Sequence, residues 1–450
     1  MDFSFSNLDK GRKAMRKGFL SVFGFALLAL ASFIAGTAEA VIHGVNGPVF
    51  NLTAKEGRVV TGDGNSIYSW GYANGNGPMQ YPGVTMIVEQ GALVTVNLVN
   101  RLPVPVSIVF PGQAQVSAVG GAPGVMTREA RPGETVTYRF TAEEAGTYLY
   151  HSATRPELQV EMGLVGALIV RPSGFNGAAP TAYGHIDTAY DRETLFLLTE
   201  MDSRIHEAIE MQGIDALANT NFLTRYFPNY WFINGRNAPD TMAPAFVGWL
   251  PNQPYNSMPV MQPGERLLMR VISGGRDLHP FHYHGNHAKV IAKDGRLLQS
   301  AAGLGPDIGP ELFTIQAVPG ETYDAIFQWT GKGLGWDIYG TGPGYEHECM
   351  DDSGDGYDDV TMEWCADHGK EFPVLLPDVS DLTFGGFYSG SPFMGALESL
   401  PPGQGGLNPA GGFTFMWHSH TEKEMTNYDI FPGGLMTMLI IQPPGAPVME

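Results

Sequence analysis

The sequence predicts an all-β fold of two Greek-key β-sandwich domains, and three observations lead to this prediction. The 450 residues include 58 glycines and 33 prolines among many Val, Thr, Tyr and Phe residues, a composition typical of short strands joined by turns. The chain is longer than one ordinary hydrophobic core requires, so two domains are expected. The two halves also share an internal repeat.

The repeat consists of segments that recur in the same order. "EQGALVTVNLVN" at 89–100 is echoed by "MQPGERLLMRVIS" at 261–273, and "RPGETVTYRF" at 131–140 is echoed by "VPGETYDAIF" at 318–327. "TYLYHS" followed by "GLVGALIVRP" corresponds in the same way to "FMWHSH" followed by "GGLMTMLIIQPP". These segments alternate apolar and polar residues, as strands with one buried face do.

The first 40 residues have the features of a signal peptide. Five Lys or Arg residues precede an apolar run at about 19–35, and Ala38-Glu39-Ala40 supplies a small-residue cleavage pattern. We therefore expect export to the periplasm, the cell surface or the medium, without membrane attachment after cleavage; an uncleaved anchor is the alternative. The segment also carries three Asp or Glu residues, so its removal changes the formal net charge from −20 to −22. This charge argues against nucleic acid as a partner.

Composition also indicates the domain boundaries. A Gly-, Ala- and Pro-rich stretch with little periodicity separates the two copies of the repeat. We predict a first domain at 41–172, a linker at 173–190 and a second domain at 191–450. The second copy carries an insertion at about 341–412 that the first copy lacks.

Both cysteines of the chain, Cys349 and Cys365, lie in the insertion. In an exported protein they are expected to form a disulfide, worth about 3 kcal/mol for a loop of this length. Two free thiols are the alternative.

The loop between the cysteines resembles a calcium-binding loop. Asp351, Ser353, Asp355 and Asp359 occupy positions 1, 3, 5 and 9 of that pattern, but Met362 stands where position 12 requires a glutamate. Calcium binding and a merely solvated acidic loop therefore both remain open.

Seven of the twelve histidines fall in the segments "YLYHS", "LHPFHYHGNH" and "FMWHSH": His151, His279, His282, His284, His287, His418 and His420. Residues two apart on a strand share a face, so His282 pairs with His284, and His418 with His420. Neutral imidazole is the commonest protein ligand for copper and zinc, so this grouping predicts a metal site. By contrast, we interpret four histidines outside these motifs as surface or packing residues: His185, His206, His347 and His368.

These motifs resemble those of the multicopper oxidases with two cupredoxin domains, which are related to laccases, and the resemblance covers essentially all of the mature sequence. Members carry HxH twice in the first domain, then HPxHxH, then HCHxxxH with a following Met. The resemblance implies a cupredoxin-like fold, in which a type 1 copper oxidises the substrate and its Cys passes electrons to a trinuclear cluster. It also implies a trimer, in which His151 would complete a site on another subunit.

The match is partial. Val109 and Pro111 stand at both histidine positions of the first motif, and Ala153 at one position of the second. In the fourth motif, Ser419 replaces the cysteine and Glu424 falls where the next histidine belongs. Blue copper requires a thiolate, so no type 1 site is expected.

In the intact third motif, His279 corresponds to a type 1 ligand, and His282 and His284 to cluster ligands. Five of the eight histidines that resemble trinuclear ligands survive: His151, His282, His284, His418 and His420. The sequence therefore predicts one or two copper ions, fewer than four, with Glu424 or Met425 as a further candidate ligand.

Two functions remain open. The first is a copper-dependent oxidoreductase that acts on a small molecule or a metal ion without a type 1 copper. The second is a non-catalytic, exported metal-binding or cell-surface protein that keeps the scaffold. Hydrolysis by a metal-bound water is a weaker third hypothesis, because no suitable base is identifiable.

Overall fold

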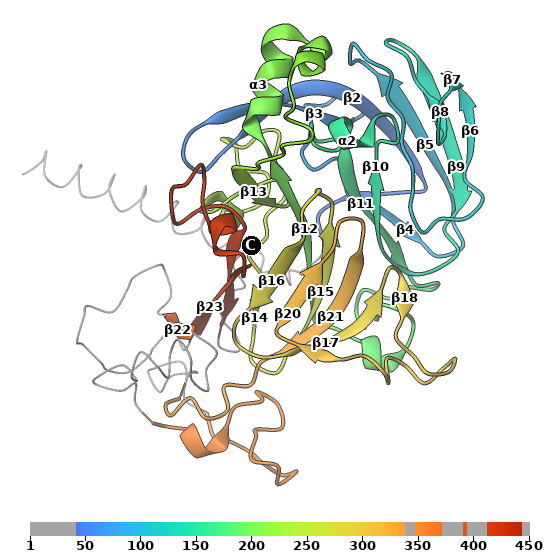
Figure 1. Ribbon diagram of the computed structural model, residues 1–450. Helices are drawn as coiled ribbons and strands as arrows, with labels where there is room; N and C mark the ends of the chain where they lie inside the picture. Colours follow the sequence, from blue (N-terminus) through green and yellow to red (C-terminus); the bar gives the residue numbers. More distant parts are fainter. Residues whose placement is uncertain (1–41, 338–346, 371–389, 394–411, 443–450) are drawn as a thin grey trace, which may run out of the picture. The chain divides into compact units, whose positions relative to one another are not determined.

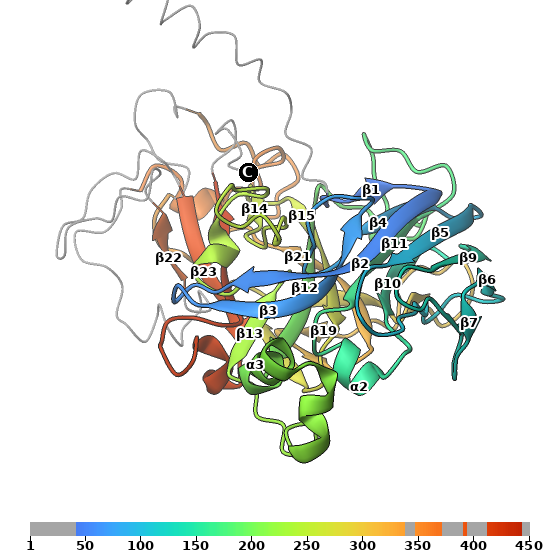
Figure 2. The same ribbon diagram turned by 90° about the horizontal axis from the view of Figure 1, so that it is seen from above.

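The structure is a computed structural model that describes residues 42–337, 347–370, 390–393 and 412–442, and strands dominate it (Figures 1 and 2). The first half contributes two main sheets. In order, one contains β1 (Val45–Asn46), β4 (Met86–Glu89), β11 (Val165–Arg171) and β10 (Gly146–His151). The other contains β3 (Ser66–Asn74), β2 (Val49–Val60), β5 (Leu93–Asn100), β9 (Thr135–Thr141) and β6 (Ser117–Gly120). The short strands β7 (Ala122–Pro123) and β8 (Arg128–Glu129) form a separate pair.

The second half contributes two further sheets. One contains β13 (Tyr230–Ile233), β12 (Arg192–Met201), β15 (Arg266–Ser273), β21 (Thr322–Gln328), β17 (Ala288–Lys293) and β18 (Arg296–Leu297), with β19 (Glu311–Leu312) beside β17. The other contains β14 (Val260–Met261), β24 (Met436–Ile441), β23 (Gly412–Ser419), β16 (His279–Tyr283) and β20 (Thr314–Ala317), with β22 (Gly390–Phe393) beside β23. The predicted all-β fold class is confirmed.

The internal repeat appears in the strand pairing. β5 pairs antiparallel with β9, and the echoing segments β15 and β21 pair in the same way. His151 on β10 lies opposite Val165 on β11, just as His418 on β23 lies opposite Met436 on β24. The alternation of apolar and polar residues favours the same strand pairing in both halves, because it gives each strand one apolar face that is buried in the core.

The sandwiches enclose apolar cores, and a further apolar cluster joins the two halves. In that cluster Leu149 and Ile169 from the first half pack with Leu197, Phe232 and Ile272 from the second. The boundaries at 41–172, 173–190 and 191–450 stay a prediction.

Within the described ranges, helical structure is limited to short segments. The α-helices described are α2 (Pro156–Gln159) and α3 (Ser203–Gln212), and the 3₁₀ turns described are η1 (Ile186–Thr188), η2 (Ile214–Asn219), η3 (Asp240–Met242), η4 (Cys365–Asp367) and η5 (Glu422–Met425). Asp202 caps the N-terminus of α3 by accepting from the amide of Arg204, and Ile205 and Ile209 pack into the first-half core. Across the described ranges, no helix is long and apolar enough to cross a membrane.

Two sequence predictions concern segments that are described partly or not at all. The expected signal peptide at 1–40 lies outside the described residues. The insertion at about 341–412 is described over 347–370 and 390–393, and its second part adds β22 to the sheet edge. The predicted disulfide between Cys349 and Cys365 is confirmed, with Cα atoms 5.6 Å apart.

Candidate metal centre

The metal-site histidines of the second half come together on two neighbouring strands. β16 and β23 are antiparallel, and His282 lies directly opposite His418. Phe281, Tyr283 and Trp417 alternate with these histidines and are buried in the core, so the imidazoles occupy the other face of the sheet. The glycine of the HPFHYHG motif is also required here, because Gly285 has φ +111° and a Cβ would lie 3.1–3.2 Å from the aromatic rings of Phe327 and Phe415.

The ring nitrogens converge at a distance suited to a metal ion. Nε2 of His284 lies 3.2 Å from Nε2 of His418, and His282 offers a ligand atom within 4.8 Å of both. Two nitrogens that bind one ion at about 2.0–2.1 Å, with an angle close to tetrahedral, are separated by about 3.3 Å. His284 and His418 therefore already stand at the spacing of two ligands on one copper or zinc ion, and His282 lies close enough to be a third.

The protein fixes the orientation of two of these rings. The Nδ1 atom of His282 lies 2.7 Å from the hydroxyl of Thr314 on β20, and the Nδ1 atom of His418 lies 2.7 Å from the carbonyl oxygen of Ser419. The carbonyl can only accept, so Nδ1 of His418 carries the proton and Nε2 keeps its lone pair. This is the tautomer that a metal ligand requires.

Burial and crowding keep these imidazoles neutral. Desolvation and then the neighbouring rings of His284, His418 and His420 lower the pKa of His282 to about 3. Desolvation also lowers the pKa of His418. Neutral rings at ordinary pH are ready to bind a cation without first releasing a proton.

His420 lies at the rim of the site. Its ring centroid is 4.8 Å from that of His282, and its side chain is 54% exposed. Its Nδ1 atom lies 3.2 Å from a carboxylate oxygen of Glu422. The group therefore opens to solvent on the His420 side.

His279, the candidate type 1 ligand, has a different environment. Its Nδ1 atom lies 2.9 Å from Glu424, its Nε2 atom lies 2.8 Å from Glu200, and the ring is fully buried. Burial alone would lower the pKa of His279, but the hydrogen bonds to the two carboxylates raise it to about 10. Desolvation would raise the pKa of Glu200, but the contacts with His279 and the amides of Arg276 and Asp277 together lower it. An imidazolium with two carboxylates therefore occupies this part of the fold.

Ser419 lies close to this group in the sheet. It pairs with Phe281, so it shares the core-facing side with His279 rather than the side of the metal-site histidines. It is fully buried, and its hydroxyl accepts a hydrogen bond from the amide of Thr421. The alternation predicted for the HSH segment is therefore present.

The first-half motif positions also lie side by side. Val109 and His151 form a bridge in which each amide donates to the carbonyl of the other, at 2.9 and 3.3 Å. Ala153 is buried at 5% exposure. Desolvation lowers the pKa of His151. Within one chain, His151 does not join the group formed by His282, His284 and His418 in the described residues.

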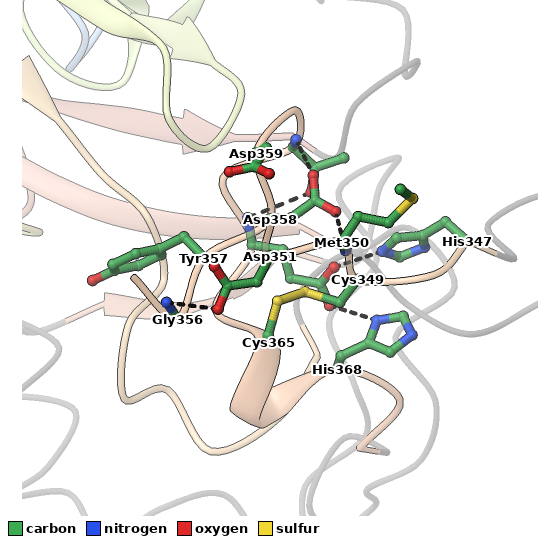
Figure 3. Close-up of a disulfide and its surroundings, with 12 residues drawn as sticks. His347, Cys349, Met350, Asp351, Gly356, Tyr357, Asp358, Asp359, Cys365 and His368 are labelled. Carbon is green, nitrogen blue, oxygen red and sulfur yellow. Dashed lines mark hydrogen bonds and ion pairs between the residues drawn. A yellow bond between two sulfur atoms is a disulfide. The ribbon is translucent and has the colours of Figure 1, made fainter. Parts of the chain in front are cut away.

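Two of the candidate calcium residues, Asp351 and Asp359, lie in a tight loop beside the disulfide (Figure 3). Asp351 accepts hydrogen bonds from the amides of Asp355 and Gly356 and from the hydroxyl of Ser353, while Asp359 accepts one from the amide of Asp352. These hydrogen bonds hold the backbone of the loop. Calcium binding stays a prediction.

Sequence reasoning missed several residues around the site. Glu200 is the next-to-last residue of β12 and lies 79 positions from His279, and no motif marks it. Its other carboxylate oxygen accepts from the amides of Arg276 and Asp277 and from the hydroxyl of Tyr226. Thr314 likewise lies 32 positions from the histidine that it orients.

Comparison with known proteins agrees with this architecture. Residues 63–174 match the sequence family described as multicopper oxidase. Multicopper oxidase MCE of Talaromyces pinophilus is 40% identical over 95 residues, which are 21% of this chain and only 15% of that protein. A copper-containing nitrite reductase of Alcaligenes xylosoxydans xylosoxydans is 27% identical over 258 residues, 55% of this chain and 69% of that protein.

Among solved structures, the blue copper oxidase from Nitrosomonas europaea superposes with a TM-score of 0.53 at 21% identity, over 87% of this chain and 85% of that one. This likeness shows a shared cupredoxin-type fold. Together, these comparisons show a cupredoxin-type fold and a segment, 63–174, that is similar to multicopper oxidases.

Proposed function

We propose that this chain is an exported copper-binding protein that holds one or two copper ions at the histidines of β16 and β23. The observation that carries this proposal is the convergence of the Nε2 atoms of His284 and His418 at 3.2 Å beside His282. His420 is a further ligand at the open rim. The count of surviving histidines supports fewer than four copper ions in one chain.

Catalysis as a copper-dependent oxidoreductase is the first form of this proposal. Copper bound here supplies one-electron chemistry. Thr314 and the carbonyl oxygen of Ser419 orient two ligand rings, and the exposed edge at His420 admits a small molecule or a metal ion. The substrate would meet the site directly, because Ser419 offers no thiolate path from a type 1 copper.

A non-catalytic copper-binding role is the second form. Its support is the buried cluster of Glu200, His279 and Glu424, which occupies the place through which electrons enter in the family. Measured turnover separates the two forms, since both predict bound copper.

Three finer proposals accompany this function. Export follows from the signal-peptide features at 1–40, and the disulfide supports it because such bonds persist in oxidising compartments. A homotrimer would let His151 of one subunit complete the copper site of another. Calcium at the loop of Asp351 and Asp359 is testable by calorimetry.

The copper proposal predicts that His284→Ala loses the bound ion. Wild-type protein loaded with copper is expected to retain about one ion per chain without a blue absorption band, because imidazole ligands without a thiolate give a weakly absorbing centre. Mass spectrometry of metal content and electron paramagnetic resonance of the same samples measure this.

His287→Ala is the matched control, because His287 lies in the same segment but outside the group of His282, His284 and His418. Equal copper retention in wild type and His284→Ala would refute this copper site. If the protein retains zinc instead of copper, the metal site is supported, but the proposal that the chain is a copper-dependent oxidoreductase is overturned.

A further inference from the structure

A second group of side chains that could bind a metal lies in the insertion, apart from the histidines of β16 and β23. Nε2 of His347 is 2.7 Å from one carboxylate oxygen of Glu363, and Nδ1 of His368 is 2.8 Å from the other. The two imidazole rings are 4.8 Å apart (Figure 3). We propose that His347, Glu363 and His368 bind a divalent transition-metal ion such as Zn²⁺.

The disulfide holds these three residues together. His347 lies two positions before Cys349, Glu363 lies two positions before Cys365, and His368 directly follows η4. Linking the two cysteines therefore brings both ends of the loop, and a ligand from each end, to one place. The ion would meet donors that are already ordered, which reduces the entropy lost on binding.

Burial and charge favour a cation at this point. The side chain of Glu363 is only 3% exposed, whereas those of His347 and His368 are 25% and 29% exposed. A buried carboxylate is costly unless it is paired with positive charge. A divalent ion supplies that charge, and the partly exposed rings leave it a path from solvent.

A further carboxylate connects the group to the sandwich. Oδ2 of Asp337 lies 3.9 Å from Nδ1 of His368, and the side chain is fully buried. Asp337 belongs to the segment that follows β21, and its amide donates to the carbonyl of Lys370. An ion shared by this group would fix the insertion to the second-half sandwich.

The distances require only a small adjustment. Zinc binds imidazole nitrogen and carboxylate oxygen at about 2.0–2.2 Å, which sets neighbouring ligand atoms about 3 Å apart. The present separations of 2.7 and 2.8 Å are those of hydrogen bonds, so each ring would move by a few tenths of an ångström. Three protein ligands leave a coordination position for Asp337 or water.

The test uses the full, disulfide-bonded chain with the substitutions His284→Ala and His418→Ala as the background. These two substitutions remove the proposed copper site at β16 and β23. After chelator treatment, calorimetry with Zn²⁺ is expected to show one ion per chain, and Co²⁺ to give a visible spectrum of a nitrogen- and oxygen-ligated ion. Zn²⁺ is also expected to raise the Tm of this background. Adding His347→Ala/His368→Ala should weaken Zn²⁺ binding by more than about 100-fold, since losing a residue that merely orients a ligand already costs about 10–100-fold.

His185→Ala is the matched control, because it removes a histidine outside both groups, and it should leave Zn²⁺ affinity unchanged. The proposal is overturned if the background binds no Zn²⁺ and shows no shift in Tm, a result that does not depend on any insertion variant folding. Unchanged affinity in the His347→Ala/His368→Ala protein would overturn it as well. Neither result bears on copper at β16 and β23, which is measured in chains with His284 and His418 intact.

Discussion

Glu200→Gln is expected to lower the free energy of unfolding by about 3 kcal/mol, near the lower end of the effect of breaking a buried ion pair. Glu200 and His279 are both fully buried, and their side chains meet at 2.8 Å. The amide keeps the size of the side chain but removes the charge opposite the imidazolium. Glu424 still contacts His279, which limits the loss. Chemical denaturation measures the difference, with Glu207→Gln on the exposed face of α3 as the matched control.

The same variant changes the dependence of stability on pH. The pKa of His279 is about 10 in the folded protein against an ordinary value of 6.5, so protonation of this ring stabilises the fold fully below pH 6.5. That contribution is lost as the pH rises toward 10. Wild type should therefore lose stability between pH 6.5 and 10 relative to Glu200→Gln. Parallel stability curves for the two proteins over this range would contradict the assignment of His279 as an imidazolium.

The sequence predicted the strand histidines because their relation is local. His282 and His284, like His418 and His420, share a strand face through the period of two, and "HPFHYHGNH" and "FMWHSH" are short enough to see as units. The all-β fold class followed from the same alternation and from the repeat.

The environment of His279 could not be predicted in this way. Its partners come from the end of β12 and from η5, 79 and 145 positions away along the chain. Local patterns carry no information about such pairs, and a histidine with two carboxylates looks the same in sequence as a histidine with a metal. His347 and His368 were interpreted as surface or packing residues for the same reason, since Glu363 joins them only after the loop has closed.

Building a blue copper centre at Ser419 is expected to require two substitutions. Ser419→Cys with Glu424→His should bind an additional copper ion and give the intense visible band of a copper thiolate. His279 would then offer Nδ1, which now points at Glu424, while Glu200 would keep the ring oriented through Nε2. One thiolate and two imidazoles form the trigonal set that blue copper uses.

Ser419→Cys alone is expected to give no blue band. The carboxylate of Glu424 would remain 2.9 Å from Nδ1 of His279 and hold a proton there, so that nitrogen would have no lone pair for copper. A buried thiol near that carboxylate would also resist ionisation. Adding His284→Ala to the double variant tests where the blue band arises. This substitution removes a ligand of the copper site at β16 and β23, so a band from a new centre at Ser419 should persist. A blue band in the single variant, or its absence in a folded double variant, would show that Glu424 does not control copper binding at this position.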